Sequence, residues 1–233
     1  MDHNLNHIHR QLNWLKAYAV ASSLLFGAAL LSFTSPSAKV LRATGIVIED
    51  EQGRDRILIG APIPASRQRV RTNLARVKKA WAPKLGGEQY MQAYAAYDNS
   101  ASGIVFLTED GFDKLIVGEH IPDPNTGKRL ITPSGIMLND DNGFERAGFG
   151  VSKTSSGQYR AALGLDDAGG EAGHLFVLED GTKGLRVVQN DGQLFAGSLK
   201  ANGRLFTSEK DSTGFFRLSR EGKVQAGSHA PKK

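Results

Sequence analysis

Apolar and polar residues alternate along most of the chain after residue 43, and the alternation comes in repeated units. Each unit runs from a glycine into an apolar strand, then through two or three acidic or amide residues and a turn glycine to a charged residue and a second apolar strand. Alternation with a period of two gives a strand one buried face, and a glycine supplies the positive φ of a tight turn. Each unit is therefore predicted to be a β-hairpin. The four units are GIVIEDEQGRDRILIG (45–60), GIVFLTEDGFDKLIVG (103–118), GIMLNDDNGFERAGFG (135–150) and GHLFVLEDGTKGLRVV (173–188).

Turn glycines recur along the whole of this region. A lone hairpin is barely stable in water, so repeated hairpins must bury their faces against one another. Closure of the sheet would also hide the strand edges. We therefore expect an all-β domain whose repeated β-hairpins form a closed or radially arranged sheet, a shallow barrel. The predicted turns are at Gly53, Gly111, Gly143 and Gly181 within the units, and at Gly127, Gly157, Gly192, Gly203 and Gly222 outside them.

A different pattern interrupts the hairpins at 66–97, where we predict a basic helical insert. Residues 66–82, SRQRVRTNLARVKKAWA, read as an amphipathic helix that Ser66 caps and Pro83 follows. A second short helix is predicted in EQYMQAYAAY (88–97). The apolar face of the first helix comprises Val70, Leu74, Val77 and Trp81, and that of the second comprises Tyr90, Tyr94 and Tyr97.

An uncharged apolar segment lies near the N-terminus, between Lys16 and Lys39. As a helix it would be ~33 Å long, about the thickness of a bilayer's hydrocarbon core. We predict a transmembrane helix over 14–35. Two alternatives stay open. A cleaved signal peptide could use the small residues Ser35 and Ser37 as its cleavage site, and a buried core helix would also be apolar.

The charges that flank this segment nearly balance, so they hardly decide its orientation. Long domains translocate largely regardless of charge, which favours a cytoplasmic leader and a periplasmic domain at the bacterial inner membrane, in a single-pass arrangement. The predicted organisation is a cytoplasmic leader (1–13), a transmembrane helix (14–35), a linker (36–42), a β-hairpin-repeat domain (43–228) that holds the insert, and a tail (229–233).

Charge is concentrated in the insert. The net charge is +5, and no Asp or Glu occurs between residues 56 and 87. A basic amphipathic helix is suited to anionic lipid headgroups, where each basic residue contributes ~1 kcal/mol. The alternative is a surface helix that packs its apolar stripe on the β domain and exposes its charges. Nucleic acid also attracts such runs, but a membrane anchor argues against it. The candidate lipid contacts are Arg67, Arg69, Arg71, Arg76, Lys78 and Lys79.

Little in the sequence predicts catalysis or a cofactor. There is no cysteine, which excludes disulfides, thiolate nucleophiles, Cys-ligated metals and a lipoprotein anchor. No hydrolase, zinc-protease or nucleotide-binding motif is present. His120 and His174 are isolated in sequence, and a metal pair at His3 and His7 has a solvated tail as its alternative. Acidic turns at 139–142 and 166–167 could hold calcium, but hairpin turns use the same residues for backbone reasons. We therefore expect no catalytic, metal or cofactor site.

The run RAALGLDDAGGEAGHLFVLEDGTKGLRVVQNDGQLFAGSL, with the two earlier units at 45–60 and 103–118, resembles a group of uncharacterised bacterial proteins. Those proteins have one N-terminal membrane segment followed by repeated strand, acidic turn, glycine and strand units. The pattern is similar to that of the β-flower family, whose members are shallow symmetric barrels of β-hairpins around an apolar channel. The resemblance covers about 14–64 and 103–200, implies membrane attachment and brings no catalytic residues. The basic segment at about 65–100 departs from the pattern.

These observations predict a non-enzymatic, membrane-tethered β-repeat domain. Its expected role is that of an envelope binding module for a lipid, an apolar ligand or a protein partner. One alternative is a structural or self-assembling envelope subunit. Another is a hydrolase whose site is made of scattered Asp, Glu and His residues.

Overall fold

The computed structural model describes residues 2–33, 40–122, 132–154, 156–203 and 205–229, and divides into two compact units at Ala43 and Thr44. The first unit contains one helix, α1 (Asp2–Phe33), which includes most of the predicted leader and the apolar segment as far as Phe33. Within the part of the chain that the structure describes, no helix combines the length and the apolar character needed to cross a lipid bilayer. The transmembrane helix expected over 14–35 is therefore not found.

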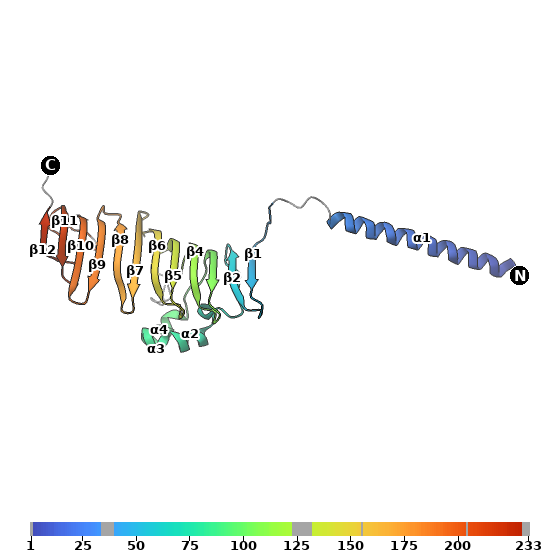
Figure 1. The fold of residues 1–233 in the computed structure, drawn as a ribbon, viewed down its shortest axis with the longest axis horizontal. Helices are drawn as coiled ribbons and strands as arrows, with labels where there is room; N and C mark the ends of the chain where they lie inside the picture. The colour runs from blue at the N-terminus through green and yellow to red at the C-terminus, as the bar shows by residue number, and fades with distance from the viewer. Residues whose placement is uncertain (1, 34–39, 123–131, 155, 204, 230–233) are drawn as a thin grey trace. The chain divides into compact units, whose positions relative to one another are not determined.

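The second unit is built on one antiparallel sheet in which each strand pairs with its neighbours in sequence (Figure 1). This meander confirms the predicted hairpin repeats. The described strands are β1 (Gly45–Glu49), β2 (Asp55–Gly60), β3 (Ser102–Leu107), β4 (Asp113–Glu119), β5 (Thr132–Asn139), β6 (Glu145–Lys153), β7 (Tyr159–Asp167), β8 (Gly170–Val177), β9 (Lys183–Gln189), β10 (Gly192–Leu199), β11 (Ser212–Leu218) and β12 (Val224–His229).

The sheet is open, so the prediction of a closed or radially arranged barrel is wrong. Among the described strands, β1 and β12 each pair on one side only. A closed sheet would need β1 to pair with β12, and the order of the described strands contains no such pair. Connections pack on one face of the sheet, where Ile63 lies beside Leu58 and Val105, and Phe206 packs on Phe195.

Six hairpin turns in the described residues share one hydrogen-bond pattern. In the first turn the N–H of Asp50 donates to the carbonyl of Arg54, and the N–H of Gly53 donates back to the carbonyl of Asp50, both at 2.9 Å. This is the geometry of a turn that closes with one residue of positive φ, which glycine adopts without a steric cost. The predicted turns are therefore confirmed at these positions, whereas Gly127 lies outside the described residues. The turn glycines, with φ between 71° and 88°, are Gly53, Gly111, Gly143, Gly157, Gly181 and Gly222.

A second set of glycines lies in one line of register across the sheet, on β1 to β6 and on β9 to β11, while β7 and β8 have Ala162 and Phe176 at the same positions. Neighbouring strands place them directly opposite one another, as in the pairs Gly103 and Gly118, and Gly135 and Gly150. A Cβ at Gly118 would lie 2.0 Å from the carbonyl oxygen of Ser102, so the strands approach too closely for any side chain. We call these residues the glycine row: Gly45, Gly60, Gly103, Gly118, Gly135, Gly150, Gly184, Gly197 and Gly214.

The insert between β2 and β3 is helical, but not as one long helix. Asn73 interrupts it, because its backbone is extended and its side chain accepts the N–H of Arg76 at 3.2 Å as the cap of α2. Ser66 is not a cap and instead donates to Asp55 at 2.7 Å. The described elements are the 3₁₀ turn η1 (Val70–Thr72), α2 (Leu74–Ala80), α3 (Ala82–Leu85) and α4 (Glu88–Tyr94).

These helices lie below the turns between β3 and β4 and between β5 and β6 in the view of Figure 1. Trp81 anchors them, because its indole N–H donates to the carbonyl of Asn142 in the β5–β6 turn at 2.7 Å. The N–H of Val70 likewise donates to the carbonyl of Gly111 at 2.8 Å. The predicted apolar faces are buried except at Leu74, which is 48% exposed. The buried cluster contains Val70, Val77, Trp81, Tyr90, Tyr94 and Tyr97.

A candidate binding face on the sheet

The two faces of the sheet differ in what lies over them. The covered face carries two buried apolar clusters: Leu58, Val105 and Ile116 pack with Ile63 and Ile121, and Phe195 and Phe216 pack with Phe206. We call the opposite side the bare face, because its apolar side chains remain exposed. Its first row lies beside the glycine row and contains Ile46, Ile59, Ile104, Val117, Ile136, Phe149, Leu163, Leu175, Leu185, Ala196 and Phe215.

Exposure is highest in the middle and C-terminal part of this face. Phe149 and Leu175 are each 55% exposed, and Phe215 is 72% exposed. Charged side chains of the described strands come to the bare face only near strand ends, at Glu119, Lys153, Lys183 and Arg217. A second apolar row runs parallel to the first and contains Ile48, Ile57, Phe106, Leu115, Leu138, Ala147, Leu165, Val187 and Leu194.

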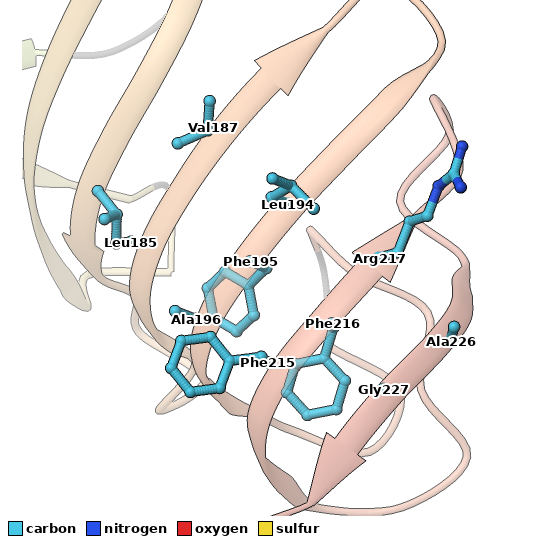
Figure 2. A pocket seen from close by; sticks show the side chains of 10 residues that line it. All are labelled: Leu185, Val187, Leu194, Phe195, Ala196, Phe215, Phe216, Arg217, Ala226 and Gly227. Atoms are coloured by element: carbon cyan, nitrogen blue, oxygen red, sulfur yellow. The ribbon is translucent and has the colours of Figure 1, made fainter.

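An open pocket of about 550 Å³ lies on the bare face over β9 to β12 (Figure 2). Leu185, Val187 and Leu194 form one side, and Phe215 forms the other. The small residue Ala196 lies between them in register with Leu185 and Phe215, which leaves the hollow. The lining is almost wholly apolar, so the pocket is suited to an apolar group and offers few atoms for polar recognition.

The covered face has a polar interruption between its two apolar clusters. His174 and Arg186 face each other across β8 and β9, and both contact Glu171 at 3.0 Å. Arg186 also donates to Gln193 at 2.7 Å. Burial lowers the pKa of His174 below its usual value, and the negative charge of Glu171 opposes this only in part. His174, which is isolated in sequence, thus lies inside β8 and belongs to a polar cluster.

Two of the six predicted lipid contacts are buried, so their side chains do not reach a lipid surface in this fold. Arg69 and Arg71 are 4% and 1% exposed. Arg69 forms two hydrogen bonds of 2.7 Å to the carboxylate of Asp113, and Arg71 forms a third of 2.5 Å. Burial alone would raise the pKa of Asp113, but the two guanidinium groups outweigh it and lower the pKa to about 2. These arginines join the insert to β4.

The other four basic residues lie nearer the surface. Arg67 pairs with Glu49, and Lys78 pairs with Glu88. Arg76 donates to the main-chain carbonyls of Gln68 and Asp110. Lys79 is exposed and has no ion pair among the described residues. Lipid contact by these four side chains stays a prediction, while the contacts that the structure shows hold the insert against the hairpins.

The acidic turns use their carboxylates as backbone acceptors. Asp140 accepts the N–H groups of Asn142 and Phe144 at 2.9 and 3.0 Å and pairs with Arg146 at 2.6 Å. In the described residues, no group of three or more His, Cys, Asp or Glu side chains is placed to hold a metal ion. The side chain of His3, part of the candidate metal pair with His7, lies outside what is described.

A second pocket of about 460 Å³ lies between α3 and the turns of β5–β6 and β7–β8. It brings Glu145, Asp166 and Asp167 near one another. The carboxylate of Asp167 accepts the N–H of Gly169 at 2.6 Å, as a turn residue would. No sequence motif pointed to this pocket, because its residues come from three separate connections.

Together these features define a class of protein: an open meander of β-hairpins, with one face covered by its own connections and the other left apolar and bare. No protein-family model, curated protein or solved structure matches the chain.

Proposed function

We propose that the β domain is a non-enzymatic binding module and that the bare face is its binding surface. The observation that carries the proposal is the asymmetry of the sheet. The connections shield one apolar face, yet the other shows an uninterrupted apolar surface with charges only at its rim. Its partner is an apolar ligand or the apolar surface of a protein.

The size of this surface supports a binding role. Strands about 4.8 Å apart, with some five residues of each at about 3.3 Å per residue, give the bare face roughly 900 Å². Soluble monomers seldom expose contiguous apolar patches larger than about 600 Å², and larger ones usually mark interaction sites. Because the hydrophobic effect scales with the apolar area removed from water, most of the binding free energy would come from this face.

Replacing Leu194 with aspartate should weaken binding of an apolar fluorescent probe, such as a naphthalene sulfonate dye, by about tenfold. Leu194 is 50% exposed at the edge of the open pocket, and a carboxylate there would have to lose its hydration when the probe binds. Fluorescence titration of the purified chain measures the effect. Leu74→Asp is the matched control, since Leu74 is 48% exposed on the insert, away from the bare face. Equal loss in both variants would contradict this assignment.

We also propose that α1 attaches the chain to a lipid bilayer. Its large apolar side chains are exposed all around the helix, including Trp14, Tyr18, Leu25 and Phe26. Burying one such side chain stabilises by roughly 2 kcal/mol, so covering several would contribute on the order of 10 kcal/mol. The orientation and the bacterial inner-membrane location stay predictions from the sequence.

If α1 is the attachment, the full chain should stay with the membrane fraction of the producing cells after alkaline carbonate treatment. The double variant Leu24→Lys and Phe26→Lys should shift most of the chain to the supernatant, because charge is costly in an apolar environment. Leu163→Lys and Leu175→Lys, made together on the sheet, form the control and should leave the distribution unchanged. Release of the unaltered chain by carbonate would contradict the proposal.

A further inference from the structure

We propose that a second copy of this chain occupies the bare face, packed against it about a two-fold axis that runs parallel to β8, above the bare face and midway between the two sheets. This inference rests on the proposed function and names the partner of the same surface. Two sheets that pack face to face lie about 10 Å apart and interdigitate their inner side chains. The resulting pair would bury the apolar rows of both copies from β4 to β12.

The area matches a stable dimer. A two-fold axis over β8 overlaps β4 to β12, nine of the described strands, so each copy buries roughly 700 Å² and the pair about 1,400 Å², within the range of standard specific interfaces. A two-fold pair also needs only one kind of surface. If residue i of one copy contacts residue j of the other, then residue j of the first copy contacts residue i of the second. A fluid lipid surface would need apolar area alone, with no matching of side-chain sizes.

Across this axis each of the two rows contains one pair of a large and a small side chain, on β6 and β10. Rotation about this axis places β6 of one copy over β10 of the other, and keeps each row over itself. In the first row Phe149 then lies over Ala196, and in the second row Ala147 lies over Leu194. A large side chain meets a small one in both rows. Ala196 is the residue that leaves the open pocket hollow, so Phe149 of the second copy would fill it (Figure 2).

Among the described strands this arrangement brings no like charges together, and it places Arg217 of β11 over Leu138 of β5. The same rotation brings β9 over β7, where Lys183 comes over Ala161. On the axis itself Leu175 faces Leu175 of the second copy, and Leu163 lies over Leu185. No like charges meet in the centre of the pair, whereas like charges directly opposite would cost stability and select against it.

Thiol cross-linking tests the pairing, because the chain contains no cysteine and each variant would carry a single thiol. Leu175→Cys, Ile136→Cys and Leu74→Cys are made in the full chain and treated in intact cells with a membrane-permeant bis-maleimide that spans about 10 Å, the spacing of packed sheets. Leu175→Cys should give a covalent dimer. Ile136→Cys should not, since its copies lie six strands apart, or roughly 29 Å. Leu74→Cys, on the insert, should not cross-link either.

Adding Phe149→Ala to the Leu175→Cys chain should lower the dimer yield about tenfold, and Phe149→Leu should restore most of it. Absence of the Leu175→Cys dimer overturns the inference, and so does equal cross-linking of Ile136→Cys. If Leu175→Cys stays monomeric but its thiol is shielded from a water-soluble maleimide until lipid is extracted, lipid is the occupant and the second copy is not. If the chain is a monomer that still binds the apolar probe, the dimer is ruled out but the proposed binding function is not. If the chain is a monomer that binds no probe, both the dimer and the proposed binding function are ruled out.

Discussion

Replacing Asp113 with alanine is expected to lower the free energy of unfolding by about 4 kcal/mol. Asp113 is 2% exposed and is the shared partner of Arg69 and Arg71, which are also buried. Its removal would leave two guanidinium groups away from water without an opposing charge, and such groups are costly to bury unpaired. Urea denaturation of the purified chain, followed by tryptophan fluorescence of the insert, measures the loss.

The neighbouring ion pair supplies the control. Lys114 pairs with Asp141 at 2.6 Å, but both side chains are exposed, so Lys114→Ala should cost less than about 1 kcal/mol. Asp113→Asn provides a milder second variant if the alanine variant does not fold. Equal stabilities of Asp113→Ala and the unaltered chain would contradict the assigned role.

The dependence of the free energy of unfolding on pH separates the contribution of the Asp113 charge from the contribution of its packing. Its pKa falls from 3.8 to about 2 on folding, so the stabilisation is complete above pH 4 and is lost as the pH falls from about 4 to about 2. The unaltered chain should therefore lose more stability over this window than Asp113→Asn. If the free energy of unfolding fell equally with pH in both chains, the charge of Asp113 would not contribute to stability.

Replacing Gly118 with alanine is expected to lower the free energy of unfolding by about 3 kcal/mol or more. The new Cβ would lie 2.0 Å from the carbonyl oxygen of Ser102 and 2.9 Å from the Cα of Gly103. Both are backbone atoms of the paired strand, so relief requires the strands to separate. The φ of Gly118 is 152°, which adds backbone strain for a residue with a side chain.

Gly173→Ala is the matched control in another strand of the sheet. Its Cβ would meet its nearest neighbour, the carbonyl oxygen of Arg186, at 3.4 Å, which is ordinary contact. We expect a change below about 1 kcal/mol in thermal or urea unfolding. If the two alanine variants were equally stable, the glycine row would not be a close approach of strands.

The hairpins could be predicted because their signals are local. An acidic residue and a glycine three positions later are enough to define the turn at Asp50 and Gly53, and alternation defines the strands on either side. The curvature of the sheet, in contrast, is not determined by a local sequence signal. Whether the sheet closes depends on whether β1 pairs with β12, and these two strands lie at opposite ends of the strand order.

The basic residues of the insert show the same limit of prediction from local sequence. The absence of acidic residues from 56 to 87 suggested exposed charge, but the partner of Arg69 and Arg71 is Asp113, which arrives from β4. A count of charges within a window cannot reveal a partner outside it. The bare face was hidden for a related reason: β1 has apolar residues on both sides, Ile46 and Ile48 on one and Val47 on the other, so alternation alone does not tell which side is covered.

The order of the strands has a consequence for how the chain assembles as it is synthesised. Almost every pairing joins strands that are close in sequence, so each hairpin can form as soon as its second strand is available. The pairing of β2 with β3 is different, because it must close over the whole insert. The anchors of that insert, Gly111 and Asn142, are made later than the helices that bind them. We expect the N-terminal part of the sheet to mature only after β6 has emerged.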